Sequence, residues 1–388
     1  MYRLTFFSAL MLAQAAAPVC GSSGSSMVNT QAIVVNAGPA STYFNGAFTS
    51  VVLCVPGTNT CQTISGILVD TGSSGLRVLS SALTLPLPQQ TGSGGAPVAE
   101  CGEFTDGFTW GPVQTADITL AGEQAKNAPI QVIGSPAFSN IPPNCLSTGA
   151  PEDTLADLGA NGILGVGLFR QDCGLACTFT GSANPGIYYV CALGSCTVTT
   201  QALAQQVQNP VWLFPSDNNG VGITLPSVPA GGLAGTMGMM RFGIGTQSDN
   251  SLGSSQVQTT DAVGNFTTVF NGQSFGSSFI DSGSNGLYLL DTATTGLPTC
   301  SDAPDFYCPP TLTQLSATNR GANGAVKPVG FQIGNADALN ETFTAFSEIG
   351  GPNPGLFDWG LPFFYGRTVF VGIEGQSTPG GVGPYWAY

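Results

Sequence analysis

Two aspartates, Asp70 and Asp281, stand in matching contexts, one in each half of this 388-residue chain. Each ends an apolar run and is followed by a hydroxyl residue, a glycine and a serine, as Asp-Thr-Gly-Ser and Asp-Ser-Gly-Ser. One such motif would be weak evidence, because Asp and Gly are ordinary turn residues. Two copies in the same frame predict a duplicated unit that contributes one carboxylate from each half.

Two carboxyl groups within hydrogen-bonding distance share a proton, because ionising both is costly. One carboxylate of such a pair acts as a general base on water, and the proton on the other polarises a substrate carbonyl. We therefore predict that Asp70 and Asp281 are catalytic. This chemistry requires no metal and no cofactor.

The residues that follow each aspartate are predicted to hold the pair in place. A glycine lets the chain turn sharply and approach the other loop closely. The hydroxyl residue is expected to hydrogen-bond the backbone of the opposite loop, and the serine to donate to its own aspartate, which favours the charged form. The predicted supporting residues are Thr71, Gly72, Ser73, Ser282, Gly283 and Ser284.

The composition favours an all-β protein and excludes several functions. Short apolar runs are separated by Gly, Pro, Asn and Ser, with 54 Gly and 27 Pro in total. That texture is typical of many strands joined by tight turns. The net charge of −14 argues against nucleic-acid or anionic-lipid partners. The absence of histidine excludes Ser-His and Cys-His nucleophiles and His-ligated zinc.

The N-terminus and the cysteines indicate a secreted, periplasmic or cell-surface protein. Residues 1–17 resemble a secretory signal peptide, and no other apolar run is long enough to predict a membrane span. Eleven cysteines fit an oxidising compartment, although thiolate metal sites are an alternative for some. One disulfide assignment among those possible pairs Cys54 with Cys61, Cys101 with Cys145, Cys173 with Cys177, Cys191 with Cys196, and Cys300 with Cys308. Cys20 is left over, and a lipid anchor there is an alternative.

The expected organisation is a flexible segment at 18–42, an N-terminal lobe at 43–250 and a C-terminal lobe at 251–388. Residues 104–120 are expected to form a hairpin whose turn lies at 106–107 or at 110–112. A helix-like stretch is expected around 198–207. Each lobe also holds a second segment after its aspartate, Ile-Leu-Gly at 163–165 and Asp-Trp-Gly at 358–360.

These paired motifs resemble those of the pepsin-like aspartic peptidases, as a divergent bacterial-type member, over nearly the whole mature chain. The resemblance implies a bilobal double β-barrel with pseudo-two-fold symmetry and an active cleft between the lobes. It also implies Asp70 and Asp281 as the catalytic pair, segments 163–165 and 359–360 behind the catalytic loops, and residues 104–120 in place of the flap. The expected activity is endopeptidase cleavage of polypeptides at acidic pH by a monomer.

The chain departs from the family pattern at the flap. Arg77 stands where members usually carry Trp, and there is no Tyr between Cys101 and Leu120. Phe104 or Trp110 is therefore predicted to be the flap aromatic residue. Arg77 is predicted to lie near the cleft rim and to favour an acidic substrate side chain; the alternative is a solvated strand-edge arginine.

Two alternatives to an active peptidase remain open. One is a catalytically silent lobe pair that binds peptides or partners, or inhibits them. The other, a Gly/Ser/Thr-rich solenoid, would require a short repeat that the chain lacks. A preference for large apolar substrate residues is predicted from six apolar residues near the expected site. The alternative is that these residues belong to the hydrophobic core and do not contact substrate. They are Leu76, Leu164, Leu287, Tyr288, Leu361 and Phe363.

Overall fold

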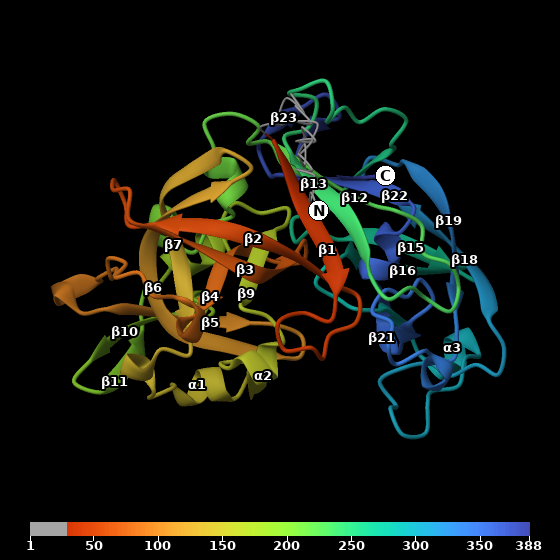
Figure 1. Cartoon of the computed structure of the whole chain (residues 1–388), viewed down its shortest axis with the longest axis horizontal. Helices are drawn as coiled ribbons and strands as arrows, with labels where there is room; N and C mark the ends of the chain where they lie inside the picture. Colours follow the sequence, from red (N-terminus) through yellow and green to blue (C-terminus); the bar gives the residue numbers. More distant parts are fainter. Residues whose placement is uncertain (1–28) are drawn as a thin grey trace, which may run out of the picture.

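The computed structural model describes residues 29–388, so the predicted signal peptide and Cys20 lie outside the described residues. Strands dominate this part of the chain, and they form two lobes on either side of a shared sheet (Figure 1). The α-helices are single turns at α1 (Pro143–Leu146), α2 (Leu155–Leu158) and α3 (Thr292–Thr295). Among residues 29–388, no helix has the length and apolar character needed to cross a membrane. The all-β, bilobal architecture is confirmed.

The N-terminal lobe is built on a closed six-stranded barrel. Its strands run in the order β6-β7-β4-β9-β3-β2, and β2 pairs again with β6. Their bounds are β2 (Gly46–Cys54), β3 (Cys61–Asp70), β4 (Ser74–Leu79), β6 (Gly107–Leu120), β7 (Glu123–Ile133) and β9 (Gly162–Val166). Beyond β6 the sheet continues through β5 (Val98–Glu103), β10 (Tyr188–Ala192) and β11 (Ser195–Val198), and β8 (Ala150–Pro151) pairs with β6.

A central sheet joins the two lobes. It takes strands from both ends of the chain, because β22 pairs with β12 and β13 pairs with β1. The strands, in spatial order, are β1 (Thr30–Asn36), β13 (Thr236–Phe242), β12 (Gly220–Leu225), β22 (Arg367–Gly372), β25 (Tyr385–Ala387) and β14 (Val257–Thr259). The lobe boundary near residue 250 stays a prediction.

The C-terminal lobe repeats the local topology of the first. A seven-stranded sheet runs β19 (Val326–Ile333), β18 (Thr313–Arg320), β15 (Phe266–Phe270), β16 (Gln273–Ile280), β21 (Asn353–Trp359), β17 (Leu287–Leu290) and β20 (Gly350–Gly351). A small hairpin of β23 (Ser377–Thr378) and β24 (Gly381–Val382) lies outside it. In both lobes the strand that carries the aspartate motif pairs in parallel with the second segment, β3 with β9 and β16 with β21. The next strand then pairs antiparallel to it, β4 with β9 and β17 with β21.

The five predicted disulfides are present in the described residues, which confirms that cysteine assignment. Cys54–Cys61 and Cys191–Cys196 each join opposed residues of a hairpin. The Cys101–Cys145 bond fixes β5 to the short helix α1 and has the largest sequence separation, 44 residues. Four of the five bonds lie between residues 54 and 196, and because such cross-links reduce the freedom of the unfolded chain, they stabilise the loop-rich N-terminal lobe.

Three local predictions were wrong in whole or in part. Residues 30–36 are not flexible, because they form β1 and pair with β13 and β2. The hairpin turn lies at 104–106, which agrees with the alternative at 106–107, whereas the alternative at 110–112 is wrong because these residues are within β6. Gly111 is required there because a Cβ atom would lie 1.9 Å from the Val132 carbonyl oxygen. Residues 198–207 contain only a three-residue 3-10 turn, Leu203–Gln205, since β-branched residues and side-chain bonds to the loop backbone favour extended chain.

Asn45 links the two lobes from a fully buried position. Its amide donates to the carbonyl oxygens of Asn285, at 2.8 Å, and Phe346, at 2.9 Å. Its oxygen accepts from the Phe346 N–H and the Tyr365 hydroxyl, both at 2.8 Å. One side chain therefore satisfies polar groups from three separate segments of the C-terminal half.

Replacing Asn45 by alanine should lower the free energy of unfolding by about 3 kcal/mol, because buried polar groups would lose their partners. Equilibrium denaturation with urea measures this difference. Asn36→Ala is the matched control, since Asn36 is exposed at the end of β1; it should change stability by less than about 0.5 kcal/mol. Equal effects of the two substitutions would contradict the bridging role of Asn45.

Candidate functional site

The two aspartates meet where the lobes face each other. Asp70 ends β3, and Asp281 follows the last residue of β16. The Gly72 N–H donates to Asp70 Oδ1 at 2.7 Å and lies 3.2 Å from Asp281 Oδ1, so one backbone group bridges both carboxylates. The Gly283 N–H donates to Asp281 Oδ1 at 2.7 Å. A Cβ atom on Gly72 would lie 2.7 Å from Asp281 Cγ, so only glycine permits this approach.

The predicted hydrogen bonds between the opposite loops are present and are symmetric. The Thr71 N–H donates to Ser282 Oγ at 3.1 Å, and the Ser282 N–H donates to Thr71 Oγ1 at 2.9 Å. Each hydroxyl then donates across the interface, Thr71 to the Ile280 carbonyl and Ser282 to the Val69 carbonyl. All four groups are buried, so these bonds hold the two loops in a fixed relation.

The two serines also contact the aspartates, but not in equivalent ways. Ser73 Oγ donates to Asp70 Oδ2, and Ser284 Oγ donates to Asp281 Oδ2 at 2.9 Å. Ser284 Oγ lies 2.6 Å from a further carboxyl oxygen, Asp358 Oδ2. Because a hydroxyl carries one proton, Ser284 hydrogen-bonds both carboxyls only when one of them, Asp281 or Asp358, is itself protonated and donates to Ser284 Oγ.

Asp358 adds a third carboxyl group to the site. It belongs to the Asp-Trp-Gly segment, but no role for its carboxyl group was predicted from the sequence. It lies on β21, is 6 % exposed, and pairs with Phe279 and Tyr288. Its Oδ1 has no hydrogen-bond partner among residues 29–388. A comparison of the two second segments could have identified it, because Asp358 occupies the position that the apolar Ile163 occupies in the first half of the chain.

Burial sets the protonation of this group of acids. Burial, and then the negative charge of Asp70, raise the pKa of Asp281 well above its ordinary value. Burial, and then the charge of Asp281, likewise raise the pKa of Asp358. Protons are therefore retained here at pH values where an exposed aspartate has lost its own.

The aspartate pair lies in a cavity of about 490 Å³. Phe104, at the β5–β6 turn (residues 104–106), lines this cavity with Glu103 and Thr105, and its role as the flap aromatic residue stays a prediction. The remaining apolar walls come from both halves of the chain. They are Leu168, Phe169, Val263, Phe279, Ile280 and Trp386.

Trp110 does not lie in this cavity, so its prediction as a flap aromatic is wrong. It is 2 % exposed, packs edge-on against Tyr189, and donates from Nε1 to the Phe138 carbonyl oxygen at 2.7 Å. The cause is that β6 runs unbroken through this position, which places the side chain in a buried cluster. Among the six apolar residues considered as cleft walls, all but Tyr288 are buried core residues, and none of the six lines the cavity.

Arg77 lies neither at the cleft rim nor in solvent, so both predictions for it are wrong. It is 3 % exposed on β4, which lies between β7 and β9 inside the barrel and has no free edge. Its Nη2 lies 2.5 Å from Glu100 Oε1 and 3.2 Å from Asp172 Oδ2. The Arg77 side chain is therefore enclosed by the protein and cannot contact a substrate directly.

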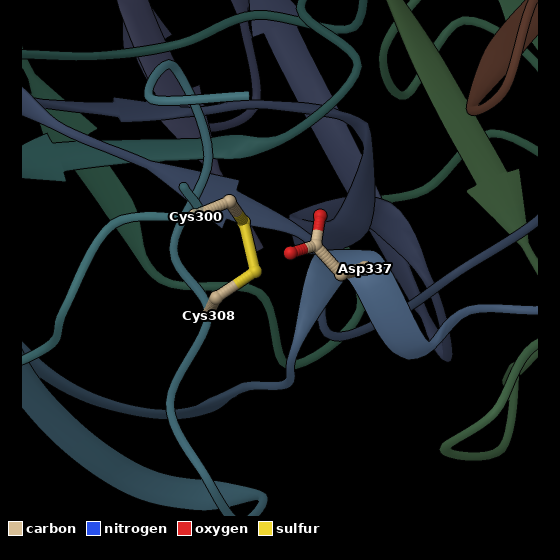
Figure 2. A group of neighbouring side chains, drawn as sticks. All are labelled: Cys300, Cys308 and Asp337. Carbon is tan, nitrogen blue, oxygen red and sulfur yellow. A yellow bond between two sulfur atoms is a disulfide. The ribbon is translucent and has the colours of Figure 1, made fainter. Parts of the chain in front are cut away.

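A group of potential metal ligands lies in the C-terminal half of the chain and does not include either aspartate of the pair. Figure 2 shows the Asp337 carboxylate beside Cys300 and Cys308, with all three ligand atoms within 4.8 Å. The two sulfur atoms are joined to each other, so neither is the thiolate that binds a metal. This group does not make a metal centre.

The fold and the paired aspartate loops define a bilobal, pepsin-like β protein. The chain is similar to the crystal structure of an aspartic proteinase from Irpex lacteus, with a TM-score of 0.53 and 15 % sequence identity. That similarity covers 92 % of this chain and 96 % of the other. The chain belongs to the family described as protein of unknown function (DUF3443), whose model matches residues 25–388. No curated protein matches it.

The raised pKa of Asp358 predicts the sign of a pH effect on stability. A proton is held more tightly in the folded than in the unfolded state, so the free energy of unfolding falls as pH rises from the ordinary value of 3.8 through the raised value. Asp358→Asn removes this titration, so the decline should become shallower by up to about 1.4 kcal/mol per pH unit.

Urea denaturation at pH 4, 5, 6 and 7 measures this slope. Asp261→Asn, at an exposed turn, is the control and should keep the wild-type slope. An unchanged slope in Asp358→Asn would show that Asp358 is not a buried acid with a raised pKa.

Proposed function

We propose that this protein is an aspartic-type endopeptidase in which Asp70 and Asp281 share one proton and activate a water molecule. The observation that carries this proposal is the bridging contact of the Gly72 N–H with both carboxylates, in a cavity that both lobes line. Two carboxyls held this closely form one titrating unit. The similarity to an aspartic proteinase supports the fold that this chemistry requires.

The mechanism follows from the environments of the two carboxyls. In the state with one shared proton, one aspartate removes a proton from water while the other donates a hydrogen bond to the substrate carbonyl. The water oxygen attacks the carbonyl carbon to give a tetrahedral diol. Transfer of a proton to the leaving nitrogen then accompanies cleavage of the C–N bond. The Thr71–Ser282 hydrogen bonds would keep the carboxyls in place through these steps.

The substrate is proposed to be a polypeptide with large apolar residues beside the cleaved bond. The support is the cavity wall, where Phe104, Phe169 and Trp386 come from three separate segments. The walls differ from those predicted from sequence, yet the apolar character is the same. Burial of a large side chain against such walls contributes about 1.5–3 kcal/mol.

An extracytoplasmic location belongs to the same proposal. Five disulfides in the described residues are stable only where thiols are oxidised. When the carboxylates are neutralised in acid, the 8 Lys and Arg residues and the absence of His leave little net positive charge, so an acidic medium suits this surface.

Asp70→Asn and Asp281→Asn should each lower kcat/KM for peptide cleavage by about 10⁴-fold, because each removes one half of the general acid–base pair. Cleavage of a denatured protein mixture between pH 2 and 7 measures this. Wild-type activity should peak in acid and fall as the pair loses its shared proton. Asp302→Asn, at an exposed position, is the matched control and should keep activity.

Two results would contradict the proposal. Retained cleavage in either mutant would exclude the shared pair as the catalytic group. No cleavage by the folded wild-type protein at any pH would leave a peptide-binding or inhibitory cleft as the function of this fold.

A peptide library should show cleavage beside Leu, Phe or Met, because the cavity walls are apolar. Mass spectrometry of the products gives the frequency of each residue on both sides of the cut. The same library with its large apolar residues replaced by Ser and Asn should be cut about tenfold less efficiently or worse. Equal cleavage of both libraries would contradict the proposed preference.

A further inference from the structure

Arg77 connects the loop of Asp70 to the turn that covers the cavity. It lies on β4, which begins at Ser74 directly after the catalytic loop, and its Nη1 donates to the Ser74 carbonyl oxygen at 3.0 Å. Its Nη2 donates to Glu100 on β5 at 2.5 Å. Its guanidinium also lies 5.6 Å from the ring centre of Phe104, at the β5–β6 turn. One side chain thus touches the base of the catalytic loop, the β5 strand and the cavity wall.

The side chain is enclosed by β5, so the contact is specific to this hairpin. A Cβ atom on Gly102 would lie 2.9 Å from Arg77 Nε, which shows that the guanidinium lies directly against the strand backbone. Glu100 is fully buried, and its own carbonyl oxygen accepts from Gln131 Nε2 at 2.9 Å. The arginine and its partner are therefore both removed from solvent, where an ion pair is little screened.

The charges of Arg77, Glu100 and Asp172 balance when one of the two acids is protonated. Arg77 carries one positive charge, whereas Glu100 and Asp172 would carry two negative charges if both were ionised. Burial, and then the charge of Glu100, raise the pKa of Asp172 well above its ordinary value. Asp172 Oδ1 also accepts from the Tyr188 hydroxyl at 2.7 Å. With Asp172 protonated, Arg77 and Glu100 form a neutral buried pair that links β4 to β5.

We propose that Arg77 is a positioning residue that holds the β5–β6 turn over the Asp70–Asp281 pair through its contacts with Glu100 and Phe104. Its kinetic consequence rests on the peptidase activity proposed above. The proposed anchoring of the β5–β6 turn by Arg77 can be tested whether or not the protein has that activity.

The test compares Arg77→Lys with wild type in the full chain. Lysine keeps the positive charge that the two buried acids require, but it cannot reproduce the planar set of donors that reaches Glu100 and Ser74 together. Hydrogen exchange of the backbone amides of 98–113 should become about tenfold faster or more, while exchange in β12 and β13 stays at the wild-type rate. In peptide cleavage, kcat should fall about tenfold or more with a smaller change in KM, because the turn is misplaced.

Arg241→Lys is the matched control. It makes the same substitution at another ion pair, Arg241 with Asp249 at 3.4 Å, which lies in the central sheet. It should change neither quantity by more than about twofold. If Arg77→Lys does not fold, Glu100→Gln tests the same contact, because the remaining Arg77–Asp172 pair is balanced in charge; it should shift both readouts in the same direction.

The outcomes separate the two proposals. Wild-type exchange rates at 98–113 in Arg77→Lys would overturn the anchoring role. Faster exchange with unchanged kcat would overturn the positioning role. If the wild-type protein cleaves no peptide, the peptidase proposal fails, and the exchange comparison alone decides whether Arg77 anchors the turn.

Discussion

Two carboxyl groups from different lobes approach each other so closely that one backbone N–H contacts both. Like charges at this distance repel, so the arrangement is stable only if a proton is shared and the loops cannot move apart. Two glycines permit the approach, and the reciprocal Thr71–Ser282 hydrogen bonds prevent separation. Burial then raises the pKa of Asp281, so the structure that brings the acids together also keeps a proton between them.

The architecture serves this constraint at longer range. Parallel pairing of β3 with β9 and of β16 with β21 places each aspartate at or directly after the C-terminal end of its strand, which is the more buried end. The central sheet and the Asn45 hydrogen bonds then fix one lobe against the other. An error of an ångström between the lobes would break the bridging contact of Gly72, so rigid connections between lobes are as important as the loops themselves.

The sequence predicted the features that a duplicated local pattern encodes. The Asp-Thr-Gly-Ser and Asp-Ser-Gly-Ser copies, the all-β texture and the short-range cysteine pairs are all visible in the chain. Arg77 and Trp110 could not be placed, because a position within a strand does not show which neighbouring strands cover it. Asp358 was visible as a departure from the repeat, but its contact with Ser284 depends on how β21 packs behind the Asp281 loop. The cavity walls also come from distant segments, and no local pattern predicts that Val263 and Trp386 lie together.

The proposed function requires Asp70 and Asp281 to titrate as one unit with a shared proton. Carbon NMR of protein labelled at the aspartate carboxyl carbons measures this directly, with Asp70→Asn and Asp281→Asn spectra to assign the signals. We expect both carboxyl signals to change together in two well-separated steps, the second far above the ordinary aspartate range. Independent single-step titration of the two residues near the ordinary pKa of about 3.9 would show that they do not share a proton.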